Sequence, residues 1–215
     1  MTRVRARHPV RGFTLIEVLI VIGLLSLLMF AILPMFTNAE QRSMEALCQT
    51  LVRQAESAAN AYNNQRDFRD YPPDDSRDIN GKLKLPADNG INSGIESFLL
   101  FVNRLESRQP VFPEGEKSFC NTDGDKVGTF VGKLEKQEKV EIADPWGNPL
   151  AYFHNRNYDK PQVYRLGEVG EKGEQDQTVS PHRSPDGGWL SRSKFQVFSA
   201  GPNGKYGDED DIGNW

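Results

Sequence analysis

The chain has 215 residues, 26 basic and 30 acidic side chains, and a formal net charge of -4. The length suits one small domain, and the acidic balance argues against a general nucleic-acid-binding surface. Two cysteines are too few to make a disulfide scaffold.

The first predicted element is a long apolar helix over residues 13–36, preceded by four arginines in residues 1–12. About 24 nearly uncharged residues are enough for a helix to cross roughly 30 Å of hydrocarbon. Because the arginines precede this segment, the positive-inside rule places the N-terminus in the cytoplasm. The sequence therefore predicts a single-pass membrane helix, with the rest of the chain across the membrane.

A secretory signal peptide is the alternative interpretation, since it also joins a basic segment to an apolar one. Two observations oppose it. No Ala-x-Ala-like site closes the apolar run, and the run continues without turn residues into an amphipathic helical pattern. Removing the apolar run would discard half of one continuous helix.

Glu17 is an acidic residue inside this apolar segment. A carboxylate in hydrocarbon costs on the order of 3 kcal/mol, so we expect it to have a partner. Cleavage between Gly12 and Phe13 would create an α-amino group four positions away, which Glu17 of the same or a neighbouring copy could neutralise. Alternatively, Glu17 reaches the cytoplasmic interface.

Residues 12–22, with the sequence Gly-Phe-Thr-Leu-Ile-Glu-Val-Leu-Ile-Val-Ile, resemble the signal of type IV prepilins and type II secretion pseudopilins. The resemblance implies that a prepilin peptidase cuts after Gly12 and methylates the new N-terminal Phe13. It also implies that Glu17 recruits and aligns subunits in a filament. Pro34 falls where many pilins carry a helix-kinking proline. The resemblance covers about the first fifth of the chain.

The helix is predicted to continue through residues 37–65. One apolar stripe recurs at three- and four-residue steps, formed by Met44, Leu47, Leu51, Ala55, Ala58 and Tyr62. We expect this stripe to pack against a head domain. Beginning at Phe13, the helix would contain about 50 residues and measure roughly 75 Å.

Residues 66–215 are predicted to form a globular head. Residues 66–94 hold turn and breaker signals and indicate an exposed loop. A second amphipathic helix follows, with Ile95, Phe98, Leu99, Val102 and Leu105 on one face. Short β-like runs then occur at Val127–Val131, Val140–Ala143, Leu150–His154, Val163–Leu166 and Phe195–Ser199. The predicted fold class is α+β, with a small antiparallel sheet against the long helix.

Three features of the head are predicted to be structural. Residues 144–149, Asp-Pro-Trp-Gly-Asn-Pro, form a dense turn in which Trp146 can anchor the core, and a similar turn is familiar from major pseudopilins. Cys48 and Cys120 are expected to be separate buried thiols, with a disulfide in an oxidising periplasm as the alternative. Residues 176–188 indicate a polar loop.

The C-terminal segment concentrates oxygen-bearing residues, with four consecutive acidic residues at positions 208–211. Hard oxygen ligands on a flexible loop suit calcium, and without a cation these acids would repel one another. The segment resembles the calcium loop of major pseudopilins. The resemblance implies calcium ligands at Asp208, Asp210 and Asp211, with Asn203 and Ser199 as further candidates. The alternative is a solvated acidic tail without metal.

Other kinds of site find little support in the sequence. Residues 121–125 form a second oxygen-rich turn, but Lys126 and Gly132 break the EF-hand spacing, so we expect no metal there. The three histidines are scattered, and no Ser-His-Asp grouping or Gly-rich phosphate loop indicates an enzyme. After loss of residues 1–12, 22 basic and 30 acidic residues leave a charge of -8, which argues against nucleic-acid binding.

Together these features predict a pseudopilin of a bacterial type II protein secretion system, anchored in the inner membrane with its head in the periplasm. The partners implied by the resemblance are prepilin peptidase, other pseudopilins, inner-membrane secretion components and further copies of this chain. A type IV pilin for adhesion, motility or uptake is one alternative, and a minor pseudopilin at the filament tip is another. A membrane-anchored periplasmic protein of other function is the third.

Overall fold

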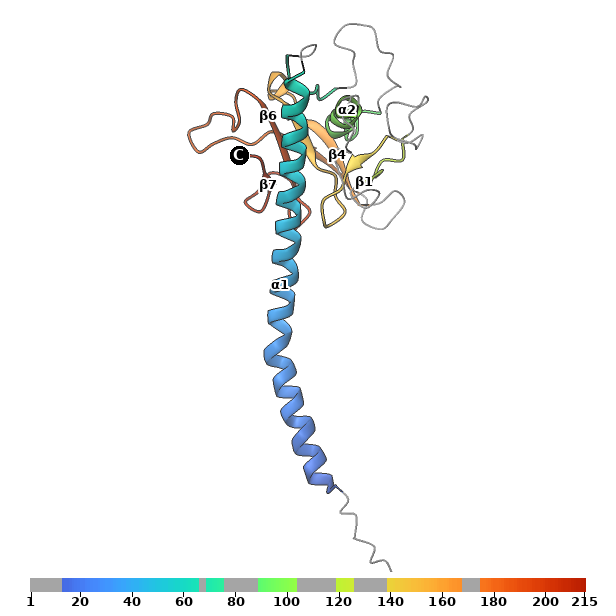
Figure 1. Cartoon of the computed structure of the whole chain (residues 1–215), viewed down its shortest axis with the longest axis vertical. Helices are drawn as coiled ribbons and strands as arrows, with labels where there is room; N and C mark the ends of the chain where they lie inside the picture. The colour runs from blue at the N-terminus through green and yellow to red at the C-terminus, as the bar shows by residue number, and fades with distance from the viewer. Residues whose placement is uncertain (1–12, 66–68, 76–88, 104–118, 126–138, 168–174) are drawn as a thin grey trace, which may run out of the picture. The chain divides into compact units, whose positions relative to one another are not determined.

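A computed structural model describes residues 13–65, 69–75, 89–103, 119–125, 139–167 and 175–215, without the side chains of residues 31–38. The chain divides into two compact units, Met1–Arg42 and Ser43–Trp215. One helix, α1 (Leu15–Asn63), contains residues of both units (Figure 1). The long helix predicted from the sequence is therefore confirmed.

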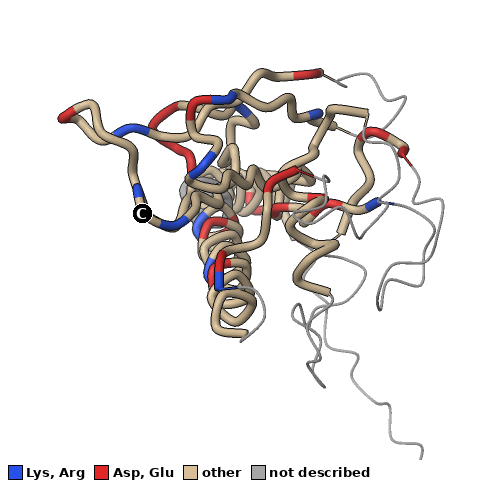
Figure 2. Tube along the Cα trace, turned by 90° about the horizontal axis from the view of Figure 1, so that it is seen from above, with Lys and Arg blue, Asp and Glu red and all other residues tan. Residues whose placement is uncertain are grey.

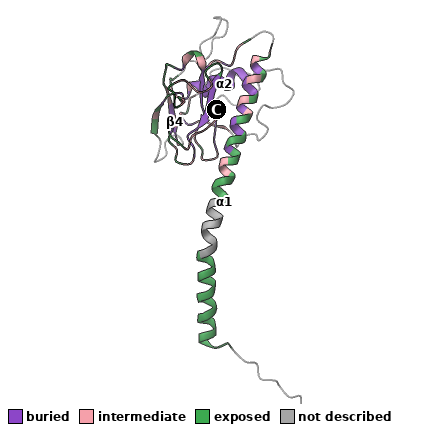
Figure 3. Cartoon of the chain, turned by 90° about the vertical axis from the view of Figure 1, so that its left-hand side faces the viewer, coloured by how far each residue is buried: buried purple, intermediate pink, exposed green. Residues whose placement is uncertain are grey.

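The first unit presents apolar side chains to its surroundings. The described side chains from Phe13 to Phe30 are all exposed, and Phe13 and Phe30 are 83% and 84% exposed (Figure 3). In the described part of the chain, no helix combines the length and hydropathy needed to cross a membrane. The predicted span over residues 13–36 stays a prediction.

In the second unit, α1 buries one face from Cys48 to Tyr62 (Figure 3). Small residues on this face, such as Ala55 and Ala59, let other elements approach closely. The predicted stripe is correct from Leu51 onward and wrong at Leu47, which is 40% exposed. The neighbouring Cys48 is buried in its place and is the first residue of the buried face.

The second predicted helix is confirmed as α2 (Ser93–Val102). It packs against α1 through an edge-to-face contact between Tyr62 and Phe101, with ring centroids 6.2 Å apart. Every residue of α2 from Gly94 to Val102 is buried, including Glu96. The predicted single apolar face therefore understates its burial, and the predicted member Leu105 lies outside the described residues.

Within the described residues, the strands are short and form three antiparallel sheets (Figure 1). They are β1 (Phe119–Cys120) with β2 (Glu141–Ile142), β4 (Gln162–Leu166) with β5 (Gln175–Val179), and β3 (Ala151–His154) with β6 (Phe195–Ser199) and β7 (Ile212–Gly213). A short 3-10 helix, η2 (Asn155–Asn157), follows β3. Helices and small antiparallel sheets agree with the predicted α+β class, although the sheet is divided. The predicted run Val127–Val131 lies outside the described residues.

Buried polar residues at 69–75 correct part of the predicted exposed loop over residues 66–94, of which residues 66–68 and 76–88 lie outside the described residues. Asp74 is 3% exposed and accepts hydrogen bonds from the His154 amide at 3.0 Å and from Asn157 Nδ2 at 2.6 Å. The Tyr152 hydroxyl donates to the Pro72 carbonyl at 2.7 Å. Turn-forming residues can also satisfy the hydrogen bonds of buried groups, so the composition of this segment did not reveal that part of it is buried.

The polar loop predicted over residues 176–188 is also partly wrong. Its first residues belong to β5, where Arg165 of β4 and Asp176 of β5 are cross-strand partners. The Arg165 guanidinium contacts both carboxylate oxygens of Asp176, at 2.6 and 3.0 Å. Four consecutive polar residues concealed a strand whose side chains remain largely in water.

The turn over residues 144–149 is confirmed, but its anchor is Asp144 rather than Trp146. Asp144 is 4% exposed, and its Oδ1 accepts hydrogen bonds from the amides of Trp146 and Asn148, each at 2.9 Å. Gly147 adopts a φ of 88°, which favours glycine. Trp146 remains partly exposed. Cys48 and Cys120 are both free thiols.

Gly94→Ala is expected to destabilise the head. A methyl group at Gly94 would collide with the Tyr152 carbonyl, Gln162 Oε1 and the Tyr164 hydroxyl. Overpacking of this kind costs about 1–3 kcal/mol. Urea unfolding of the full chain in detergent, followed by tryptophan fluorescence, measures the change.

Gly188→Ala is the matched control, because a methyl group there would meet only ordinary contacts at 3.5 Å or more. Equal unfolding midpoints for the two variants would contradict the described packing of α2.

Candidate functional site

The start of α1 is held by a reciprocal pair of side chains. Glu17 Oε2 accepts hydrogen bonds from the Thr14 amide at 2.8 Å and from the Thr14 hydroxyl at 2.9 Å. The Thr14 hydroxyl in turn accepts from the Glu17 amide at 3.3 Å. This arrangement is a capping box, which satisfies amides that lack partners at a helix start.

The capping box adds a local role to the residue predicted to mediate assembly. The Thr-x-x-Glu spacing of Thr14 and Glu17 was a visible signal for it, which the sequence analysis missed. Phe13, the predicted methylated residue, directly precedes Thr14 and is exposed. Gly12, the predicted cleavage residue, lies outside the described residues.

The C-terminal loop between β6 and β7 brings three of the predicted calcium ligands together. Asn203 Nδ2 donates to Asp208 Oδ2 at 2.8 Å and to Asp210 Oδ1 at 2.7 Å. Gly201, Gly204 and Gly207 have φ values of 64°, 67° and 96° and turn the loop back on itself. At Gly201, a methyl group would collide with the Asp210 carbonyl.

Asp208 and Asp210 influence each other electrostatically in this loop. The hydrogen bond between their side chains lowers the pKa of Asp208 and raises the pKa of Asp210. Two like charges therefore lie close together in this loop. Such a pair, exposed and joined by an amide, has the oxygen chemistry that calcium prefers.

Asp211 points away from these residues. Its side chain is 1% exposed, and its Oδ2 lies 2.5 Å from His182 Nε2 and accepts from the Gly207 amide at 2.7 Å. The His182 ring also lies 4.5 Å from the ring of Trp215, between centroids. Asp211 thus joins the loop to the C-terminal residues, and nothing in the local sequence marked His182 as its partner.

Ser199 also lies apart from the three convergent residues. Its hydroxyl donates to Asp144 Oδ2 at 2.6 Å and accepts from the Gly201 amide at 3.0 Å. It connects β6 to the turn over residues 144–149. The loop geometry therefore suits a cation at Asn203, Asp208 and Asp210, and it gives Asp211 and Ser199 other partners.

Comparison with known proteins bears on the N-terminal segment. Residues 7–33 match the family model described as the prokaryotic N-terminal methylation motif. The N-terminal segment is type IV prepilin-like. The motif indicates processing by a prepilin peptidase, suggests filament assembly, and implies a membrane-anchored N-terminus. No curated protein and no solved structure matches the chain.

We expect the acidic residues of the C-terminal loop to fall into two classes by their effect on stability. Asp211→Ala should lower the free energy of unfolding by about 1–3 kcal/mol, because it leaves His182 and the Gly207 amide without this partner. Asp208→Asn combined with Asp210→Asn should not destabilise the protein in chelator, because it removes a pair of like charges.

Urea unfolding of the full chain in detergent and EDTA measures both effects. Glu209→Gln is the control, since Glu209 is exposed in the same loop. A larger loss in the Asp208 and Asp210 double variant than in Asp211→Ala would contradict the assignment.

Proposed function

We propose that the chain is a filament-forming pseudopilin of a bacterial type II secretion system. The observation that carries this proposal is the match of residues 7–33 to the methylation motif, which establishes the type IV pilin-like character. The narrower assignment rests on two features of the head. They are the Asp144-centred turn and the glycine-rich acidic loop after β6, which resemble segments of major pseudopilins.

Assembly follows from the chemistry of the first unit. The exposed apolar side chains of residues 13–30 need an apolar environment, which either lipid or neighbouring copies of the same helix supply. When copies pack side by side with a fixed offset, each contact repeats without closing and builds a fibre. The proposed role is structural rather than enzymatic.

Glu17 would set the register between neighbouring copies. After cleavage, the methylated amine of Phe13 in one subunit supplies a positive charge that matches the carboxylate of another. Thr14 already holds that carboxylate at the helix start through Oε2. The capping box therefore positions the charge before the partner arrives, which reduces the ordering needed on assembly.

A calcium ion would fit the C-terminal loop through the carboxylates of Asp208 and Asp210 and the amide oxygen of Asn203. Asn203 now presents its Nδ2 to both carboxylates, so a bound cation requires the amide to turn. Calcium would supply the positive charge that this loop lacks, and so fix its shape for packing between heads.

The remaining charges of the head support contacts with protein rather than nucleic acid. Figure 2 shows acidic and basic positions interleaved along the described part of the head. A nucleic-acid surface would gather Lys and Arg on one face. A type IV pilin shares the same N-terminal motif, so the composition of native fibres distinguishes it from a pseudopilin.

The first test is the intact mass and N-terminal sequence of the protein from its native membrane. We expect a chain that begins at N-methylated Phe13. Gly12→Val should leave residues 1–12 attached, because it replaces the glycine that the resemblance assigns to the cleavage site. Cleavage beyond residue 36 would overturn the proposal, since the assembly helix would then be lost.

Two substitutions separate the charge of Glu17 from its capping role. Glu17→Gln keeps a capping partner for Thr14 but removes the charge, and we expect at least a tenfold loss of incorporation into sheared fibres. Thr14→Ala removes the capping hydroxyl but keeps the charge, and we expect incorporation to remain within about twofold of wild type. Equal losses would show that Glu17 acts only on its own helix.

A further inference from the structure

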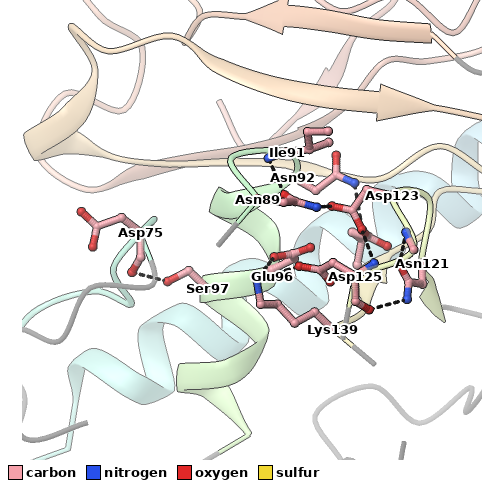
Figure 4. Close-up of polar contacts among 12 residues, drawn as sticks. Asp75, Asn89, Ile91, Asn92, Glu96, Ser97, Asn121, Asp123, Asp125 and Lys139 are labelled. Carbon is pink, nitrogen blue, oxygen red and sulfur yellow. Dashed lines mark hydrogen bonds and ion pairs between the residues drawn. The ribbon is translucent and has the colours of Figure 1, made fainter. Parts of the chain in front are cut away.

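A second group of acidic residues lies elsewhere in the head. Glu96 of α2, Asp123 of the turn after β1 and Glu141 of β2 each offer a carboxylate oxygen, and these oxygens lie within 4.8 Å of one another. Figure 4 shows Glu96 and Asp123 beside Asp125 and Lys139. We call Glu96, Asp123 and Glu141 the α2–β2 cluster. Its members come from three separate segments, so no local sequence motif indicates it.

One buried oxygen of this cluster has no partner. Glu96 is 2% exposed, and its Oε1 has no hydrogen-bond partner in the described part of the chain. Its Oε2 contacts Lys139 Nζ at 3.2 Å. A buried carboxylate oxygen without a partner is costly, so the orphaned Oε1 indicates a missing cation or donor at this position.

The other two carboxylates are held by neighbouring donors. Glu141 Oε1 accepts from Asn92 Nδ2 at 2.8 Å, and its Oε2 accepts from the Thr122 amide at 3.2 Å. Asp123 Oδ2 accepts from Asn89 Nδ2 at 2.8 Å. Donors of this kind orient metal ligands and leave their second lone pairs available.

A buried lysine also contacts this group of acidic residues. Lys139, 1% exposed, pairs with Glu96, and its Nζ lies 2.7 Å from Asp125 Oδ2. Burial raises the pKa of Glu141 to about 8 and that of Glu96 to about 10, because charged carboxylates are disfavoured there without more positive charge.

We propose that Glu96, Asp123 and Glu141 bind a calcium ion. Calcium binds oxygen ligands at 2.3–2.6 Å, so its ligands stand up to about 5 Å apart, which matches the spacing of the three carboxylates. The ion would join α2 to the β1–β2 pair and place a divalent positive charge among these carboxylates. This site is separate from the C-terminal loop and does not depend on filament assembly.

The proposed site includes Asp123, which lies in the turn over residues 121–125 where the sequence predicts no metal. The EF-hand spacing is absent there, and the turn alone offers no complete site. Tertiary structure adds Glu96 and Glu141, which lie 27 residues before and 18 residues after Asp123 in the sequence. The sequence expectation considered only ligands from one continuous loop, so Glu96 and Glu141 did not enter it.

Calcium titration of the full chain in detergent tests the proposal, by calorimetry and by metal analysis after dialysis. The background is Asp208→Asn with Asp210→Asn, which removes the C-terminal loop as a source of binding. We expect this background to bind one calcium per chain and to gain thermal stability with calcium. No binding in this background would overturn the proposal.

Asp123→Asn in the same background should weaken calcium binding at least tenfold and abolish the calcium-dependent rise in melting temperature. Asp123 is half-buried on a turn, and an unchanged circular dichroism spectrum in EDTA would show that the variant folds. Asp159→Asn, an exposed change away from the cluster, is the control. Unaltered binding by Asp123→Asn would overturn the assignment.

Discussion

Hydrogen bonding of buried polar groups is the constraint on which the head depends. Its strands contain two to five residues, so ladders of backbone hydrogen bonds satisfy few of the buried amides and carbonyls. Asp74, Asn92, Asp144 and Gln196 are all buried and supply the missing partners across long distances in the sequence. Asn92, for example, joins Thr122, Glu141 and Arg165. The fold is therefore held by polar side chains as well as by its apolar core.

The need to satisfy buried backbone groups also brings acidic side chains close to one another inside the head. Polar residues are needed where short strands end and helices start. Several of these residues are buried close to one another. Glu141 satisfies the Thr122 amide and also faces Glu96. Asp144 satisfies its own turn and also holds Ser199 at the end of β6. The structural roles and the proposed metal-binding role overlap because both need oriented oxygen atoms.

The two units meet different physical demands. The apolar side chains of residues 13–30 are exposed and need lipid or other copies, whereas the head buries its own core. A filament subunit requires this division, because a lateral contact between helices must form while each head stays folded. The Thr14 and Glu17 pair caps the helix start within a single chain.

The amino-acid sequence by itself determined the N-terminal segment, the long helix, α2, four of the strands and the turn at Asp144. These features depend on apolar periodicity or on fixed local spacing, which neighbouring residues express without help from the rest of the chain. The sequence also predicted the acidic C-terminal loop. Only the tertiary structure separated Asn203, Asp208 and Asp210 from Asp211, because His182, the partner of Asp211, is 29 residues distant in the chain. Likewise, burial of Glu96 and its approach to Glu141 depend on how α2 packs against β2, and no local pattern encodes that contact.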